Sequence, residues 1–445
     1  MLANLKRLGY LQMTPIQAAS LPIALAGKDL LAQAKTGSGK TAAFAIPLLA
    51  KLDVSRLDVQ ALVLCPTREL ADQVTQEIRR LARSEDNIKI LTLTGGVMMR
   101  GQRNSLEHGA HICVGTPGRI MDLLDRGNLE LGLVNTLVLD EADLMLDMGF
   151  YESIAYVVKR VPSLRQTFMF SATYPEGIAK LSAQFLRQPE RITVESQHDE
   201  QKIRQQFFEV QDNERLSAVS TLLNHYRPVS TLAFCNTKQQ CKSLLAELQA
   251  QGFNVLALHG ELEQRDRDQV LVQFSNRSCS VLVATDVAAR GLDIADLEAV
   301  INVDVTFEPE QHIHRIGRTG RADKEGLAFN LVSPNEMGRL NRIEDLQGRA
   351  VQWASLDDLH SATTAPLQPP MATLQILVER KEKIRAGDVL GALTGDGGIA
   401  GKNVGKITVS EFSTYVAVQR DLAKTALKHL SAAKIKGKTV RVRLL

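Results

Sequence analysis

The 445-residue chain contains few cysteines and no long apolar run, and both shortages exclude classes of protein. Its five cysteines have no metal-ligand spacing, so we expect buried thiols in a reducing cytoplasm rather than a disulfide scaffold or a zinc site. No apolar run approaches the ~20 residues that span a bilayer. The N-terminal segment MLANLKRLGYLQ lacks the apolar stretch of a signal peptide. We therefore expect a cytoplasmic protein with no membrane partner.

The net charge of +3 is unevenly distributed along the chain. Residues 371–445 hold 14 Lys and Arg against 6 Asp and Glu, a balance of +8, whereas the rest holds 39 against 44, a balance of −5. A composition of 44% hydrophobic and 23% charged residues is typical of a folded globular protein, and the length predicts two or three domains. The basic C-terminal region predicts an anionic partner, with nucleic acid the first candidate.

Two stretches of the chain alternate β-branched runs with helical patterns. The predicted strands are Asp29–Gln33, Ala61–Cys65, His111–Gly115, Thr136–Asp140 and Gln166–Phe170 in the first stretch, and Ser230–Cys235, Asn254–His259, Ser280–Thr285, Ala299–Val303 and Leu327–Val332 in the second. Continuous apolar runs between helices indicate parallel sheets covered on both faces. We therefore predict two doubly wound α/β domains, residues 1–197 and 204–350, with a polar hinge in Glu195–Arg204.

The C-terminal 75 residues predict a separate α+β domain. Within the expected linker, residues 351–370, the segment SATTAPLQPP has the composition of a semi-rigid spacer. Residues 371–445 then follow a βαββαβ order: Ala372–Val378, Ala386–Leu393, Lys406–Val409, Thr414–Val418, Arg420–Ala433 and Thr439–Leu444. That order suits a four-stranded sheet backed by two helices.

A glycine-rich segment follows the first predicted strand and opens a helix. It consists of Ala34, Lys35, Thr36, Gly37, Ser38, Gly39, Lys40 and Thr41. Glycines let the backbone wrap around phosphates, and N–H groups at a helix start face an anion. We expect Lys40 to contact the β- and γ-phosphates of ATP and Thr41 to ligate Mg²⁺. Ordinary turn glycines are the alternative, which the Lys-Thr pair disfavours.

Acidic residues follow the apolar run TLVL at the end of another predicted strand. The segment is Asp140-Glu141-Ala142-Asp143, and beside a phosphate-binding loop this is where a Mg²⁺-binding carboxylate belongs. We expect Asp140 to hold Mg²⁺ and Glu141 to orient and deprotonate the attacking water. A solvated acidic turn is the alternative, and the phosphate-binding loop makes it the weaker one.

Three arginines, Arg315, Arg318 and Arg321, recur at three-residue spacing in the segment HRIGRTGR. If the segment is helical, they would share one face. That face could be a surface patch that binds carboxylates. Alternatively, Arg318 and Arg321 reach the γ-phosphate as catalytic fingers, which contribute on the order of 10³–10⁵ in rate.

These motifs, in this order over residues 9–321, resemble those of the DEAD-box RNA helicases. The resemblance implies two RecA-like domains that share one catalytic site, with Gln17 on the adenine and Asp293 on the ribose. It also implies an aromatic residue upstream of Gln17 that packs on adenine, and the chain starts too late to include one. Either the true start lies upstream or the adenine pocket is less complete, which predicts weaker ATP binding.

The same resemblance implies contacts with the RNA backbone on both domains. The matching segments are PTREL, GG, TPGR and ATDVAARGLD, and the residues expected on RNA are Arg68, Gly96, Thr116, Arg119, Thr285 and Arg290. Ser171-Ala172-Thr173 resembles the motif that couples hydrolysis to strand separation. Hydroxyls, glycine amides and arginines suit phosphate and sugar contacts, which carry no sequence information.

The C-terminal domain matches the element order of an RNA-recognition (RRM-like) fold but lacks most of its stacking aromatics, which disfavours base stacking on the sheet. Cationic residues are plentiful instead, and we expect RNA contacts from Lys402, Lys436, Lys438, Arg441 and Arg443. A merely solubilising cationic face is the alternative. The segment AGDVLGALTGD resembles the DbpA subgroup, which implies docking on a 23S rRNA hairpin.

The sequence thus predicts an RNA-stimulated ATPase that locally unwinds or remodels structured RNA. The implied setting is large-subunit ribosome assembly, with 23S rRNA in pre-ribosomal particles as partner, ATP and Mg²⁺ as cofactors, and no obligate protein partner. An ATP-gated RNA clamp or chaperone with little unwinding is one alternative. A DNA helicase on the same fold is another.

Overall fold

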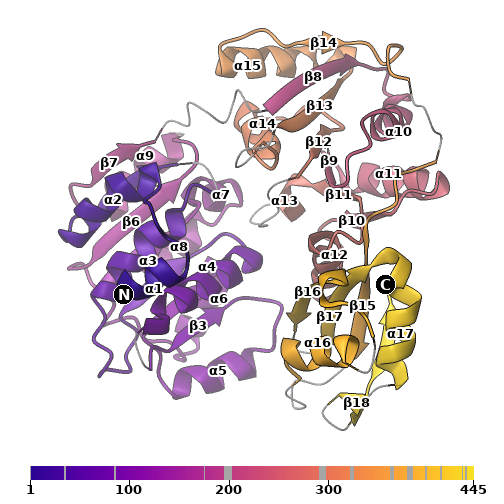
Figure 1. Ribbon diagram of the computed structural model, residues 1–445. Helices are drawn as coiled ribbons and strands as arrows, with labels where there is room; N and C mark the ends of the chain where they lie inside the picture. The colour runs from indigo at the N-terminus through magenta and orange to yellow at the C-terminus, as the bar shows by residue number, and fades with distance from the viewer. Residues whose placement is uncertain are drawn as a thin grey trace. The chain divides into compact units, whose positions relative to one another are not determined.

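The computed structural model describes residues 2–34, 37–84, 87–174, 176–194, 203–289, 297–320, 325–360, 365–377, 384–395, 398–410, 413–432, 434–435 and 438–445. These residues form two compact units that divide between residues 194 and 203 (Figure 1). The hinge expected at Glu195–Arg204 lies outside the described residues except for its last two, which begin a strand.

The first unit is built on a seven-stranded parallel sheet in the order β3-β4-β2-β5-β6-β1-β7. Its strands are β1 Leu30–Gln33, β2 Ala61–Leu64, β3 Ile90–Leu93, β4 Ile112–Gly115, β5 Thr136–Leu139, β6 Gln166–Ser171 and β7 Glu190–Thr193. Its helices are α1 Leu2–Arg7, α2 Pro15–Leu25, α3 Lys40–Ala50, α4 Arg68–Leu81, α5 Met99–Glu107, α6 Pro117–Asp125, α7 Ala142–Asp147, α8 Tyr151–Val158 and α9 Glu176–Phe185. Strand β2 is buried along its whole length, with Leu62 and Leu64 in one apolar cluster and Ala61 and Val63 in the other. The sheet is therefore covered on both faces, as predicted.

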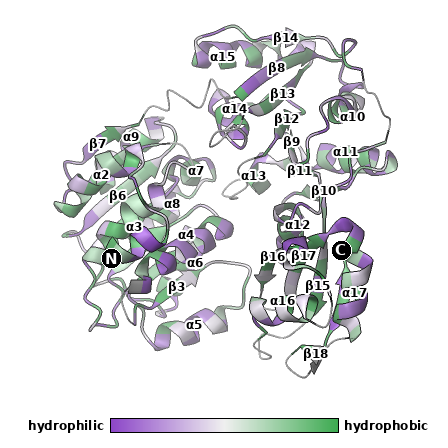
Figure 2. Ribbon diagram, viewed as in Figure 1, coloured by the Kyte–Doolittle hydropathy of each residue, from purple (hydrophilic) through white to green (hydrophobic). Residues whose placement is uncertain are grey.

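The second unit repeats this sheet, in the order β10-β11-β9-β12-β13-β8-β14 and again parallel throughout. Its strands are β8 Ile203–Glu209, β9 Thr231–Cys235, β10 Val255–Leu258, β11 Val281–Thr285, β12 Ala299–Asn302, β13 Gly326–Val332 and β14 Trp353–Ala354. Its helices are α10 Arg215–Tyr226, α11 Lys238–Ala250, α12 Gln264–Ser275, α13 Asp286–Ala289, α14 Pro309–Ile316 and α15 Met337–Gln347. In Figure 2, hydrophobic and hydrophilic residues alternate around the helices, as expected for helices with one face on a core.

All ten strands predicted for the two sheets are present, each within one residue of its expected ends. The prediction missed β3 and β7 in the first sheet and β8 and β14 in the second. Strand β7 is largely exposed, and β14 has two residues, so neither carries the continuous apolar run on which the prediction rested. Strand β14 also places the start of the expected 351–370 linker in the second sheet, and Leu356 and Leu359 pack on its core.

The C-terminal domain is a four-stranded antiparallel sheet in the order β16-β17-β15-β20, joined by a two-stranded ribbon. Its elements are β15 Met371–Leu377, α16 Ala386–Thr394, β16 Val404–Val409, β17 Ser413–Gln419, α17 Ala423–Ala432, β18 Lys434–Ile435, β19 Lys438–Thr439 and β20 Arg441–Leu444. The four-stranded sheet and its two helices follow the predicted βαββαβ order, and the ribbon of β18 and β19 was not predicted. Leu374 and Ile376 of β15 face the apolar core with α16 and α17 residues.

The opposite face of this sheet, where RNA-recognition folds stack bases, is buried as well. Thr373 and Gln375 are fully buried, and the Thr373 hydroxyl lies 3.1 Å from Asn276 Nδ2 and 2.7 Å from Ser278 Oγ, just after α12. Arg420 donates to the Ser278 carbonyl (3.2 Å). Side chains that follow α12 in the preceding α/β domain therefore cover part of the sheet face, in agreement with the scarcity of stacking aromatics.

Candidate nucleotide and RNA sites

The glycine-rich loop presents buried donors that the protein itself leaves unpartnered. Lys40, the first residue of α3, is 6% exposed, and its Nζ has no hydrogen-bond partner among the described residues. The Oγ of Ser38 is in the same condition. Gly39 precedes Lys40 at a φ of 95°, a conformation that glycine adopts without strain. Burying unpaired donors costs free energy unless a ligand accepts from them, so these residues fit the phosphates of ATP.

Gln17 joins the helix α2 to this loop. Its Nε2 donates to the carbonyl of Gly39 (3.1 Å), and its Oε1 accepts from the backbone N–H of Thr14 (3.0 Å). A Cβ built on Gly39 would lie 2.5 Å from Gln17 Nε2. The structure thus places Gln17 against the phosphate-binding loop, while its contact with adenine stays a prediction.

Asp140 and Glu141 follow β5, and both are buried. Burial raises the pKa of Asp140 to about 6, although the nearby Lys40 lowers it again. Glu141 has a φ of 50°, a strained backbone conformation for a residue with a side chain, and such strain concentrates at functional sites. A divalent cation would offset the burial of these carboxylates, and oxygen ligands suit Mg²⁺. Asp140 therefore fits a Mg²⁺ site, and the part expected of Thr41 stays a prediction.

Asp143 links the acidic segment to the segment Ser171-Ala172-Thr173, a role that the sequence prediction missed. Its Oδ2 accepts from the N–H of Ala172 (3.1 Å), the N–H of Thr173 (2.8 Å) and the Thr173 hydroxyl (2.9 Å). A carboxylate that accepts three hydrogen bonds holds its partners firmly. Movement of the acidic segment after β5 would therefore reach this segment directly.

Two arginines expected on RNA lie near each other in the first unit. The guanidinium of Arg68 packs so closely over Gly96 that a Cβ there would lie 1.4 Å from Arg68 Nη1. Arg119 donates to Gln102 Oε1 (2.9 Å), and burial followed by the charges of Arg68 and Arg126 lowers its pKa against the pull of Asp122. Thr116, half-buried, precedes α6. Neighbouring positive charges such as those of Arg68 and Arg119 are suited to a phosphate backbone.

In the second unit Arg315 lies in α14, whereas Arg318 follows the helix. The prediction that three arginines share one helical face is therefore wrong, because α14 ends at Ile316. Arg315 is 1% exposed and forms a double hydrogen bond with Asp286 (2.7 and 2.6 Å). It is consequently a buried residue rather than part of a surface patch. Thr285, at the end of β11, directly precedes Asp286.

The C-terminal domain exposes part of its expected RNA-binding set. Lys402 and Arg441 are exposed. Arg443 is exposed too, but its guanidinium donates to Gln375 Oε1 (2.6 Å) and to Gln269 Oε1 of α12 (3.2 Å). In β20, Val442 packs on the core, whereas the flanking Arg441 and Arg443 are exposed, so apolar and basic residues alternate along the strand.

Several expected site residues lie outside the described residues or have side chains outside them. These are Lys35, Thr36, Arg290, Asp293, Arg321, Lys436 and the side chain of Lys438. Their predicted contacts stay predictions. Across the described residues, no helix is long and apolar enough to cross a membrane.

Family models match three consecutive parts of the chain. Residues 14–181 match the DEAD/DEAH box helicase model, residues 214–323 the helicase conserved C-terminal domain, and residues 373–444 the DbpA RNA binding domain. The ATP-dependent RNA helicase DbpA of Escherichia coli is 52% identical over 444 residues, covering 100% of this chain and 97% of that protein. The helicase CshA of Listeria monocytogenes is 43% identical, covering 78% of this chain and 67% of that protein.

Solved structures agree with these matches. Dbp5 of S. cerevisiae bound to RNA and ADP BeF3 is 28% identical with a TM-score of 0.74, covering 80% of this chain and 93% of that one. Mss116p bound to ssRNA and AMP-PNP is 27% identical with a TM-score of 0.71, covering 79% and 76%. The chain belongs to the DEAD-box family of ATP-dependent RNA helicases, in its DbpA subgroup. It is accordingly an ATP-using RNA helicase with a C-terminal RNA-binding domain.

Proposed function

We propose that this helicase locally unwinds or remodels 23S rRNA during assembly of the large ribosomal subunit, in the cytoplasm. The observation that carries the proposal is the match of residues 373–444 to the DbpA RNA binding domain within a chain similar to DbpA over its full length. The charge of +8 on residues 371–445 supports an RNA partner for that domain. The choice of 23S rRNA as the target rests on the resemblance to the DbpA subgroup.

The proposed chemistry is transfer of the γ-phosphoryl group of ATP to water. The buried Lys40 ammonium neutralises the β- and γ-phosphates, and Glu141 orients the water and accepts its proton. The bond between the γ-phosphorus and the bridging oxygen breaks, and ADP leaves with the electron pair. Mg²⁺, when held by Asp140 and Thr41, would supply further charge neutralisation at the phosphates.

We propose that Asp293, Arg318 and Arg321 complete this site, with Asp293 on the ribose and the arginines on the γ-phosphate. Support comes from the family membership and from relatives of the same fold whose structures hold RNA together with ADP BeF3 or AMP-PNP. RNA contacts on both units, with Arg68 and Thr285 as examples, would then favour the closed, hydrolysing state.

The C-terminal domain would read RNA with exposed cations rather than with its sheet, because Thr373 and Gln375 on that sheet are buried. Lys402 and Arg441 are the exposed cations to test first, since neither makes a contact that supports the fold in the described residues. Removing either cation should weaken RNA binding and reduce the dependence of binding on salt, because fewer phosphates are then neutralised.

The test compares 23S rRNA, 16S rRNA and poly(U) as activators of ATP hydrolysis by the full chain. We expect 23S rRNA to reach half-maximal activation at a concentration about tenfold or more below that of the other two. The Lys402→Glu/Arg441→Glu variant should lose this preference and keep its turnover at saturating RNA. Equal activation by 16S and 23S rRNA would refute the proposed target.

A further inference from the structure

Arg315 holds together the carboxyl ends of three neighbouring strands of the second sheet. Its Nε and Nη2 donate to Asp286, after β11; Nη2 also donates to Asn236 Oδ1 (2.8 Å), after β9; and Nη1 donates to the carbonyl of Asp304 (2.9 Å), after β12. Nη1 further lies 3.2 Å from Asn302 Oδ1. All five N–H donors of the Arg315 guanidinium therefore have an acceptor.

Two of the joined segments carry the proposed ligand contacts. Asp286 directly follows Thr285, an expected RNA contact, and begins the stretch that leads to Asp293. Arg318, an expected γ-phosphate contact, follows Arg315 by one turn, and its backbone N–H donates to the Arg315 carbonyl (3.2 Å). A displacement of Asp286 by RNA would therefore reach the backbone of Arg318 through one side chain.

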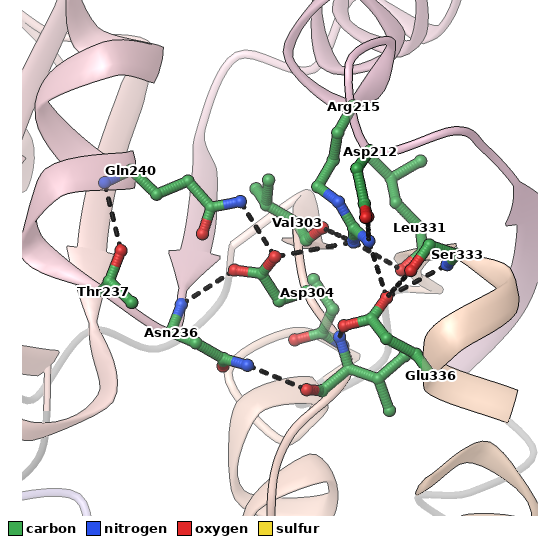
Figure 3. A network of polar contacts seen from close by, with 12 residues as sticks. Asp212, Arg215, Asn236, Thr237, Gln240, Val303, Asp304, Leu331, Ser333 and Glu336 are labelled. Carbon is green, nitrogen blue, oxygen red and sulfur yellow. Dashed lines mark hydrogen bonds and ion pairs between the residues drawn. The ribbon is translucent and has the colours of Figure 1, made fainter. Parts of the chain in front are cut away.

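Asn236 and Asp304 also connect the residues around Arg315 to the helix α11. Its backbone N–H donates to Asp304 Oδ2 (2.9 Å), while Gln240 of α11 donates to Asp304 Oδ1 (2.8 Å), as Figure 3 shows. Thr237 caps α11 by accepting from the N–H of Gln240 (3.2 Å). The strand-end segments are thus fixed to one another by side chains rather than by the sheet alone.

We propose that Arg315 is a positioning residue that couples RNA binding at the segment beginning with Thr285 to the placement of Arg318 at the nucleotide. Arg315 touches neither ligand in this scheme and acts through Asp286 and through its own backbone. The inference rests on the proposed roles of Thr285 and Arg318. It adds Arg315 as the residue that transmits a displacement from one to the other.

Arg215 provides a matched control within the same unit. It is equally buried, at 4% exposed, and pairs with Glu336 (2.7 Å), Asp212 (3.0 Å) and Asp304 (3.5 Å), as drawn in Figure 3. None of these partners is an expected ligand contact, and Asp304, which the Arg315 network shares, keeps its hydrogen bonds with Asn236 and Gln240 when Arg215 is replaced. Loss of this cluster should therefore destabilise the unit without uncoupling RNA from ATP.

The experiment compares Arg315→Lys with Arg215→Lys in the full chain. Lysine keeps the charge but cannot serve Asp286, Asn236 and the Asp304 carbonyl at once. Both variants should lower the unfolding temperature. Well below that temperature, Arg315→Lys should lower RNA-stimulated kcat about tenfold or more with the KM for ATP nearly unchanged, and Arg215→Lys should stay within about twofold of the wild type.

Asp286→Asn keeps the shape of the side chain and serves if Arg315→Lys does not fold. It should lower kcat in the same way, and the Asp286→Asn/Arg315→Lys double variant should be no worse than the worse single variant, because both changes break one link. Wild-type kcat in Arg315→Lys or in Asp286→Asn would overturn the inference, as would an equal loss in Arg215→Lys. Arg318→Ala separates this result from the proposed function, because unchanged hydrolysis there would refute the site itself.

Discussion

The two units have the same sheet topology and carry similar residues at equivalent positions, but the contacts of those residues differ. Each sheet has seven parallel strands in the same order, and in each the first helix after the first strand begins with a basic residue, Lys40 in one and Arg215 in the other. An aspartate follows the equivalent strand in both, Asp140 after β5 and Asp304 two residues after β12. The topology therefore places one cation and one carboxylate at matching strand ends.

What differs is whether the protein satisfies that pair itself. In the first unit Lys40 Nζ has no hydrogen-bond partner among the described residues, and burial raises the pKa of Asp140. In the second unit Arg215 donates to Glu336 and lies within ion-pair distance of Asp304. The first pair is prepared for an anion and a cation from outside, whereas the second is closed by side chains of the unit. According to the proposed function, the first pair binds ligand, whereas the second pair stabilises its own unit.

The largest expected effect is on catalysis, and it distinguishes a carboxylate of the first unit, Glu141, from one of the second, Glu336. Glu141→Gln removes the proposed base and should lower RNA-stimulated kcat by about 10²–10⁴. Glu336→Gln, in the closed cluster of the second unit, should lower stability and leave kcat nearly unchanged at a temperature where the protein is folded.

A strand-displacement assay with Glu141→Gln also separates a helicase from an ATP-gated clamp. The helicase should stop after a single round, because the next round requires turnover. Normal multiple-round displacement by this variant would favour the clamp.

A smaller effect is expected at Gly39, whose close contact with Gln17 has no counterpart at Gly27. Gly39→Ala introduces a Cβ at a positive φ and against Gln17, so it should raise the KM for ATP about tenfold through loss of the Gln17 hydrogen bond. Gly27→Ala is the control, because Gly27 has a φ of +83° and open space around its Cβ. Both variants should lose about 1–2 kcal/mol of stability. Equal KM values for the two would contradict the role of Gly39.

The smallest effect is a pH dependence of the second unit. Burial lowers the pKa of His312 to about 3, and the charge of Arg315 adds to this. The unfolded chain takes up a proton near the ordinary value of 6.5, so stability is complete above that pH and falls as the pH drops from about 6.5 toward 3. His312→Gln can keep a hydrogen bond to Gln205. Between pH 7 and pH 5.5, its free energy of unfolding should fall by about 1 kcal/mol less than that of the wild type. Identical pH profiles in chemical denaturation would show that His312 does not carry this dependence.

The sequence predicted the inner strands because they are apolar on both faces, and it missed exposed β7 and two-residue β14 because they are not. Lys40 could be recognised because it ends a glycine-rich loop between a strand and a helix, and Asp140 and Glu141 because they come directly after a strand. The contacts of Asp143 with Ala172 and of Arg315 with Asn236 could not, because these partners lie 29 and 79 residues away in the sequence. Nothing local to an arginine states whether it will be buried among carboxylates or exposed.

The central claim is that Lys40 and Asp140 are left to bind a ligand, whereas Arg215 and Asp304 are satisfied by contacts within their unit. One paired measurement tests this claim. Binding of AMP-PNP and thermal unfolding are measured for Lys40→Met and Arg215→Met. Lys40→Met should lose most nucleotide affinity without destabilisation, because it removes an unpartnered buried charge. Arg215→Met should keep the affinity and lose about 3–5 kcal/mol, because the buried Glu336 and Asp304 lose their shared cationic partner. Loss of affinity in Arg215→Met, or destabilisation of Lys40→Met to the same extent as Arg215→Met, would contradict the account.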